Sequence, residues 1–468
     1  LKRTALTALV SAVWTIQAVA GPLETELRNV LETHPGIKAA RLAKDASQDR
    51  VAASKAGYLP RLIISGDSGK EEITSTSYKP DGQSPTMTLG KDGTIVPNQT
   101  SSLDRNKKTV SLEQTLYNGG RREAGVDLAR LEGEIQQKNL DAQVQDVLLE
   151  AISSYLQVAR YQTLIGLSKL NEDTTQRQLE LESKRVQGGG GIAVDVLQAR
   201  TRLQIVRERR VFYEQGLRDA AANYEQVFGR APVMDAIQDL RPLESRMPSN
   251  VIVAMEKALE NNPRLSASNL MVEKAKKSIA LEKAAYLPTL DLVAMSSRDR
   301  NVNQTARREE DSVLLKMSWA LFSGMETSNR VLAASKDFEE QESRSNIATN
   351  KMREIVRINW NQLVNGAERL ELLDSAAAIS KDVMENRKRL RDAGKEPALS
   401  VLDAEVEYYG VLANKVNAMY DTRIGSYKLL QSMGELTPDN LGMNSKFEIP
   451  VQPLQIDLSQ IAASGSKR

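Results

Sequence analysis

The side chains that most enzymes use for acid–base and nucleophilic chemistry are scarce in this sequence. Its 468 residues contain one histidine, His34, and no cysteine. Without cysteine the chain cannot form disulfides, thiolate metal sites or a cysteine nucleophile, and a single histidine cannot build a histidine-clustered site. His34 precedes Pro35 at a predicted helix start, where we expect a structural role. The sequence therefore predicts no enzyme, no cofactor and no metal.

A run of four glycines at 188–191 invites comparison with a phosphate-binding loop. Such a loop needs a following Lys-Ser or Lys-Thr and a preceding strand, and QGGGGIAV has neither. Two long helical stretches flank these glycines, so we interpret them as the apex of a helical hairpin. The segment DAGKEPAL at 392–399 separates a second pair of helical stretches in the same way.

The charge balance gives no reason to expect a nucleic-acid partner. Lys plus Arg number 63 and Asp plus Glu number 61, and the two excess charges lie at Lys2 and Arg3. Phosphates demand clustered Lys and Arg, which a balanced chain does not provide.

Residues 1–20 have the organisation of a secretory signal peptide. A basic start is followed by a mostly apolar stretch and by Ala18-Val19-Ala20, which predicts cleavage before Gly21. No later run of about 18 apolar residues would make a transmembrane helix. We therefore expect an exported protein of a bacterial envelope.

The chain repeats itself in two registers. KAGYLPRLIIS at 55–65 matches KAAYLPTLDLV at 283–293 with an offset of 228, which also pairs Pro35 with Pro263. DVLQA at 195–199 matches SVLDA at 400–404 with an offset of 205, as LYNG at 116–119 matches LFSG at 321–324. The two registers indicate a tandem duplication with one insertion, located between Pro60 and Leu116.

Each copy contains a very long helical pattern. Residues 121–187 and 325–393 are rich in strong helix formers and poor in glycine. In the first, apolar residues form one stripe at 128, 131, 135, 144, 148, 152, 155 and 159. A helix of that length, about 100 Å, needs coiled-coil partners. We predict long hairpins at 121–229 and 325–434.

Before each hairpin the sequence alternates between apolar and polar residues, which predicts strand pairs at about 58–67 and 108–117 and at about 286–297 and 312–322. One face is apolar, as a lipid-facing barrel strand requires, and Glu113, Asp291 and Lys316 lie on the polar face, expected to line a barrel interior. Short strands of a soluble sheet are the alternative. Residues 66–108 have loop-type composition and are predicted to form a long external loop.

In this order and duplication, the Asn-Pro-like helix starts, the YLP motifs, LYNGG and LFSGM, and DVLQA and SVLDA resemble TolC-like outer-membrane channel proteins. The resemblance covers about residues 24–440. It implies an α+β membrane fold: a homotrimer in which each chain gives four strands to a twelve-stranded outer-membrane β-barrel, continued by a long periplasmic α-helical coiled-coil barrel. Four strands cannot close by themselves, and an open sheet edge is not tolerated in lipid, so the chain must oligomerise.

The expected organisation has five parts. They are a signal peptide at 1–20, a first repeat at 21–230, an equatorial linker at 231–250, a second repeat at 251–435, and a C-terminal equatorial segment at 436–468.

The resemblance also implies partners. The hairpin apices would contact a periplasmic adaptor, or membrane fusion protein, through Gly188, Gly189, Gly190, Gly394 and Lys395. An inner-membrane ABC or proton-driven transporter would supply the energy, because the chain has no nucleotide-binding motif. The barrel would contact outer-membrane lipid, and the helices would extend into the periplasm of a Gram-negative bacterium.

The family's pore constriction has two acidic positions that match Ser400 and Asp403 here, so only Asp403 is acidic. Asp195 matches Ser400 in the first repeat, and Arg391 or Arg185 is a candidate partner for these carboxylates. A helix cap or first-turn acid explains Asp195 and Asp403 equally well.

The absence of cysteine excludes the lipidated N-terminus of many efflux relatives, so the sequence resembles the unlipidated branch that serves type I protein secretion. The exit duct of a multidrug efflux pump is the alternative. From another class, a periplasmic adaptor or structural coiled coil would also have helical hairpins, but a single hairpin flanked by β-domains and no duplication.

Overall fold

The computed structural model describes residues 23–75, 99–237, 239–240, 246–302, 305–441, 443 and 451–452. The predicted signal peptide, the central part of the predicted external loop and most of the predicted C-terminal segment lie outside the described residues. None of the described helices is both long enough and apolar enough to cross a membrane.

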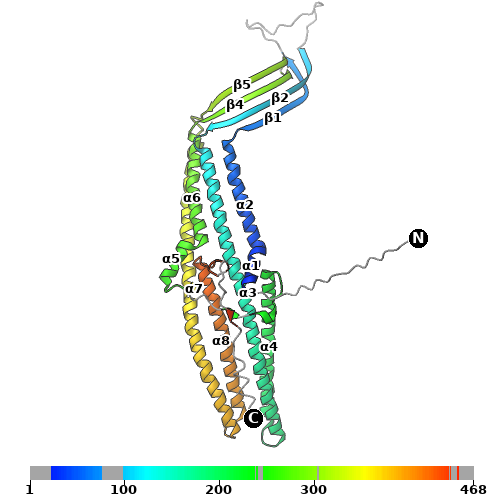
Figure 1. The fold of residues 1–468 in the computed structure, drawn as a ribbon, viewed down its shortest axis with the longest axis vertical. Helices are drawn as coiled ribbons and strands as arrows, with labels where there is room; N and C mark the ends of the chain where they lie inside the picture. Colours follow the sequence, from blue (N-terminus) through cyan, green and yellow to red (C-terminus); the bar gives the residue numbers. More distant parts are fainter. Residues whose placement is uncertain are drawn as a thin grey trace, which may run out of the picture. The chain divides into compact units, whose positions relative to one another are not determined.

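The same series of elements occurs twice along the chain (Figure 1). The first series is α1 (Leu23–Thr33), α2 (Pro35–Lys55), β1 (Arg61–Ser75), β2 (Gln99–Tyr117), α3 (Arg121–Gln187) and α4 (Ala193–Phe228). The second is α5 (Val251–Asn261), α6 (Pro263–Lys283), β4 (Thr289–Val302), β5 (Thr305–Ser318), α7 (Glu326–Asp392) and α8 (Ala398–Ser432). The predicted tandem repeat is confirmed.

Equivalent side chains cap the second helix of each series. His34 Nδ1 accepts a hydrogen bond from the Gly36 N–H at 3.2 Å, and Asn262 Oδ1 accepts one from the Arg264 N–H at 3.0 Å. Each cap satisfies an N–H group that the first turn of a helix leaves without a partner. The single histidine therefore has the structural role expected of it.

The four long strands form one antiparallel sheet in the order β1-β2-β4-β5. They are longer than the sequence predicts, because 66–75 and 99–108 continue the β1–β2 ladder. The prediction that 66–108 is all loop is therefore wrong for these residues, and only 76–98 lie outside the described part. Backbone hydrogen bonds do not require apolar alternation, so Gly-, Ser- and charge-rich segments can extend a ladder that a periodicity argument ends early.

The strands also start and end a few residues away from the predicted positions. Residues Ala56–Tyr58 and Ala284–Tyr286 form 3₁₀ turns before β1 and β4, and β5 ends at Ser318 instead of residue 322. Gly119, after β2, has a φ of +69°, and a Cβ there would lie 2.5 Å from the Ala284 carbonyl oxygen. Only glycine meets both requirements at this position.

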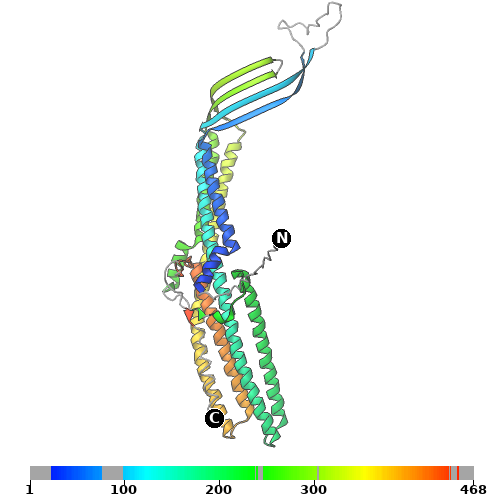
Figure 2. The ribbon, with the colours of Figure 1, turned by 45° about the vertical axis from the view of Figure 1, so that its right-hand side comes forward.

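The chain forms two compact units, and each unit contains segments of both repeats. One comprises Ala43–Gln137 and Ala267–Ile347 and contains the sheet; the other comprises Leu1–Leu42, Lys138–Ser266 and Ala348–Arg468. In the second, α3, α4, α7 and α8 run side by side (Figures 1 and 2). Its core is filled by leucines and isoleucines of α3 and by tyrosines of α4 and α8, including Leu148, Ile152, Tyr224, Tyr420 and Tyr427. The predicted apolar stripe of α3 supplies part of this core.

A second, small sheet joins two segments that the sequence assigns to separate regions. β3 (Asp239–Leu240) lies in the predicted linker and β6 (Val451–Gln452) in the predicted C-terminal segment, and they pair antiparallel. Leu240 is buried in the core of its unit.

Candidate functional site

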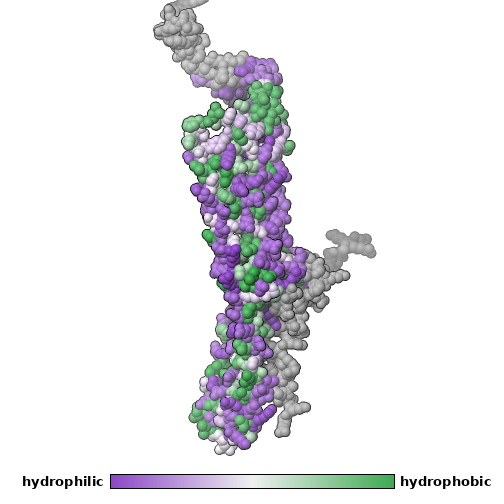
Figure 3. Space-filling model, turned by 90° about the vertical axis from the view of Figure 1, so that its left-hand side faces the viewer, coloured by the Kyte–Doolittle hydropathy of each residue, from purple (hydrophilic) through white to green (hydrophobic). Residues whose placement is uncertain are grey.

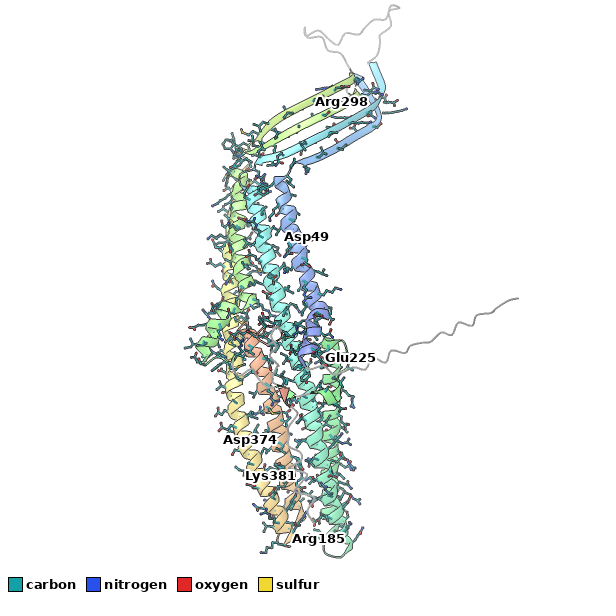
Figure 4. The ribbon with its side chains drawn as sticks, in the orientation of Figure 1. Asp49, Arg185, Glu225, Arg298, Asp374 and Lys381 are labelled. Carbon is teal, nitrogen blue, oxygen red and sulfur yellow. The ribbon has the colours of Figure 1, made fainter. Side chains whose placement is uncertain are left out.

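The first hairpin apex, between α3 and α4, closes with a Schellman motif. The Gly190 N–H donates to the Arg185 carbonyl at 3.0 Å, and the Gly189 N–H donates to the Val186 carbonyl at 3.1 Å. Gly189 has a φ of +79°, the left-handed conformation that this motif requires and that glycine adopts without strain. Figure 4 labels Arg185 at this end of α3.

The second apex, between α7 and α8, repeats the motif at the matching positions. The Lys395 N–H donates to the Leu390 carbonyl and the Gly394 N–H to the Arg391 carbonyl, both at 2.9 Å, and Gly394 has a φ of +71°. All five predicted contact residues of the two apices are exposed. The structure thus presents two equivalent turns to solvent, and their contact with an adaptor stays a prediction.

Of the predicted constriction residues, Asp195 and Ser400 lie in the first turns of α4 and α8, whereas Asp403 lies in the second turn of α8. Asp403 is half-exposed and forms an ion pair with Arg202 of α4, at 2.6 Å between Oδ1 and Nη2. Its partner within the chain is therefore neither Arg391 nor Arg185. Arg391 donates to Gln178 of α3 and also pairs with Asp392 at 2.8 Å.

Asp195 and Ser400 are half-buried. Their backbone N–H groups donate to the residues three before them, Ile192 at 3.1 Å and Pro397 at 3.2 Å, as the first turn of a helix requires. Among the described residues, the Asp195 carboxylate forms no ion pair, so its charge acts mainly on the positive N-terminal end of α4.

A buried polar contact beside these residues was missed by the sequence analysis. Glu405 of α8 is 1% exposed, and its Oε1 lies 2.8 Å from Nζ of Lys388 on α7 and 3.4 Å from Nε2 of Gln178 on α3. Its Oε2 is buried without a hydrogen-bond partner. The Glu405 carboxylate thus connects α8 with α7 and α3 within one unit. The sequence does contain a signal for this contact. Glu405 is an acid among the apolar residues of one helix face, which runs from Val401 to Tyr408 and is buried.

One turn along α8, burial raises the pKa of Tyr409 to about 12, and the nearby negative charge of Glu405 acts in the same direction. The Tyr409 hydroxyl lies 3.4 Å from Oγ1 of Thr174 on α3. The phenol is therefore neutral at physiological pH and serves as a hydrogen-bonding group between helices.

The sheet has the polar face that alternation predicts. Asp291 lies directly between Thr115 and Lys316 in the strand register, and Oγ1 of Thr115 donates to its carboxylate at 2.7 Å. Glu113, two residues from Thr115, lies on the same face and pairs with Arg61 at 3.3 Å. The three residues predicted to share a face do so.

The opposite face of the sheet is apolar and exposed. Its side chains form rows across the strands, such as Leu62, Leu112, Ala294 and Val313, and Val313 is 72% exposed. In Figure 3 the hydrophobic residues of the sheet lie beside its hydrophilic ones. No cluster of His, Asp and Glu that could hold a metal ion occurs among the described residues. A sheet with one polar and one apolar exposed face suits a position between water and lipid.

The family model for outer membrane efflux proteins matches residues 27–230 and 254–435, which are the two repeats. The chain belongs to this family. As a member it is a non-enzymatic transport protein of the outer membrane that extends into the periplasm. Channels of this TolC family form trimers within tripartite systems.

Several relatives match over most of the length of this chain. Alkaline protease secretion protein AprF of Pseudomonas aeruginosa is 26% identical, in a match that covers 84% of this chain and 80% of AprF. Proteases secretion protein PrtF of Dickeya chrysanthemi is 24% identical, in a match that covers 85% of this chain and 84% of PrtF. Outer membrane efflux protein BepC of Brucella suis is 22% identical over 91% and 88%.

Solved structures share the fold at low identity. The outer-membrane channel OprN matches with a TM-score of 0.74 and 16% identity over 88% of this chain and 90% of its own. The Campylobacter jejuni CmeC outer membrane channel matches with a TM-score of 0.72 and 12% identity over 95% and 89%. The chain therefore has the TolC-like fold of four antiparallel strands and long helices in two repeated halves.

Proposed function

We propose that this chain is the outer-membrane exit duct of a type I protein secretion system. The observation that carries the proposal is the similarity to AprF and PrtF, whose names assign them to protease secretion, over more than four-fifths of the chain.

Three copies would close the barrel. The sheet ends at β1 on one side and at β5 on the other, and neither outer edge is paired within the described residues. Unpaired backbone groups are not tolerated in lipid, so β1 of one copy would pair with β5 of the next. The exposed apolar face would then contact lipid, and the face with Asp291 and Lys316 would line a water-filled interior.

The two apices would dock the periplasmic adaptor. They are exposed, they share one backbone geometry, and three copies would present six of them. Because the described helices contain no catalytic or nucleotide-binding constellation, an inner-membrane transporter would supply the energy. Asp403, with Asp195 and Ser400 nearby, would form the periplasmic constriction.

Deletion of the protein tests the proposal when two readouts are combined. We expect one or more proteins to disappear from the culture medium while susceptibility to a panel of drugs stays unchanged. Restoring the wild-type chain should restore secretion. An unchanged secreted-protein profile would refute a role in protein secretion.

The alternative is multidrug efflux, which the match to the efflux protein BepC over 91% of the chain favours. In that case deletion would raise drug susceptibility and leave the secreted proteins intact. Loss of both would indicate a duct shared between two pumps.

A further inference from the structure

The outward, apolar face of the sheet becomes basic farther from the helices. Lys108 of β2 lies directly opposite Arg298 of β4, and two residues along, Arg300 of β4 lies directly opposite Arg307 of β5. Positions two apart on a strand share a face, so all four cations lie on the side that carries Leu112 and Val313. We call these four residues the basic row. Figure 4 labels Arg298 on the sheet.

Like charges placed directly opposite on neighbouring strands destabilise a sheet, and here two successive pairs are both cationic. Two carboxylates offset part of this charge: Asp311 pairs with Arg298 at 3.1 Å, and Glu309 contacts Arg307. The side chains of Lys108 and Arg300 are exposed, and neither has a hydrogen-bond or ion-pair partner among the described residues. Within the row, four cations against two acids leave a net positive charge, and farther out on the same face Lys70 of β1 lies opposite Asp104 of β2, a pair that adds no net charge.

The opposite face of the same strands has the contrasting pattern. Asp67, Lys107, Asp299 and Arg308 follow one another across β1, β2, β4 and β5, so each cation lies beside an acid. Arg105 adds a pair to Asp67 at 3.0 Å. The inward face therefore compensates its charges within the chain, while the outward face leaves cations without partners.

The basic row begins where the apolar surface ends. Exposed apolar side chains of the second repeat run from Val313 to Phe322, ten positions along the chain, of which 313–318 belong to β5 and 319–322 follow its end. This length is close to the roughly 9–11 residues with which a tilted strand crosses the hydrocarbon core of a bilayer. The row lies beyond Val313 on the side away from the helices, which is the level of lipid headgroups on the outer surface.

We propose that the basic row binds the phosphate groups of an anionic phosphoglycolipid in the outer leaflet. Phosphate supplies the negative charge that the Lys108–Arg298 and Arg300–Arg307 pairs lack, and Arg binds phosphate in a bidentate manner. Continuity with the lipid-facing apolar surface places the acyl chains beside Leu112 and Val313. The inference rests on the outward orientation of this face in the proposed barrel.

The test compares two double variants of the full-length, purified trimer. K108Q/R300Q removes the two cations without partners, and K107Q/R308Q, the matched control, removes two cations from the opposite face of the same strands. The probe is lipid A carrying both of its phosphates, titrated in zwitterionic detergent. Each basic side chain near an anionic surface contributes about fivefold in affinity, so K108Q/R300Q should bind about 30-fold more weakly.

Three further measurements make the result decisive. The control variant should keep the wild-type affinity, and wild-type protein should bind dephosphorylated lipid A at least as weakly as K108Q/R300Q binds the phosphorylated form. Millimolar inorganic phosphate should not displace the lipid. Equal losses in both variants, no preference for phosphate on the lipid, or full displacement by free phosphate would each overturn the inference. Trimer migration on a gel and secretion in cells report separately on the proposed function.

Discussion

Arg202 of α4 and Asp403 of α8 form an ion pair of 2.6 Å that joins the first repeat to the second near the hairpin apices. The side chains are 36% and 52% exposed, so the pair contributes at most about 1 kcal/mol to stability. Its larger consequence is electrostatic, because Arg202 offsets the charge that Asp403 would present in a threefold constriction.

We predict opposite effects for the two members of this pair. D403A would remove the proposed ring of three carboxylates and should reduce cation preference and block by multivalent cations in planar-bilayer recordings. R202A leaves those carboxylates without their partner and should increase both. D173A, which removes an exposed acid paired with Arg177 within α3, is the control. Unchanged selectivity in both D403A and R202A would place the constriction elsewhere.

The buried Glu405 predicts a dependence on Lys388. K388M leaves a carboxylate of 1% exposure without its cation and should lower the free energy of unfolding by about 2–3 kcal/mol, since Lys388 itself is 30% exposed. The double variant K388M/E405M replaces both charges and should recover most of that loss. Denaturant titration of the purified protein measures it. K336M, at an exposed Lys336–Glu339 pair, should change stability by less than about 1 kcal/mol.

At the apices, we predict that added negative charge blocks export. G188E combined with K395E should lower export about tenfold or more, because these exposed turns would carry the adaptor contact. Gly188 has no positive φ and can accept a side chain, whereas Gly189 and Gly394 cannot without strain. The trimer should remain intact on a gel. Normal export by this double variant would contradict docking at these turns.

The sheet-bearing unit should lose stability in acid through Glu132. A hydrogen bond donated by Lys274 of α6, followed by one from Gln136, lowers the pKa of Glu132 below its usual value. A lowered pKa contributes stability above the unfolded value of about 4.5, and this contribution disappears as pH falls through the folded value. The melting temperature of wild type should therefore fall more than that of E132Q between pH 7 and pH 3. An equal fall in melting temperature for wild type and E132Q would show that the Glu132–Lys274 pair has no such role.

Several features of this fold are local, and the sequence predicts them. Helix composition and the glycine breaks give α3 its bounds, because propensity and the need for a left-handed residue are properties of short segments. The duplication is visible in residues 55–65 and 283–293, and the alternation of Glu113 with its neighbours gives the polar face of the sheet. Periodicity identifies a face from one segment alone.

Other features depend on which segments meet, and only the tertiary structure decided them. Periodicity places Asp403 on an exposed face but cannot name Arg202, which lies 201 residues away, as its partner. Likewise, Lys388 makes Glu405 tolerable at a position that the apolar pattern would give to a hydrophobic residue. The outer halves of β1 and β2 carry no apolar pattern that would predict strands. They are strands because their backbones pair with each other and, for part of β2, with β4. The free energy of pairing two segments depends on both of them, so neither segment alone predicts it.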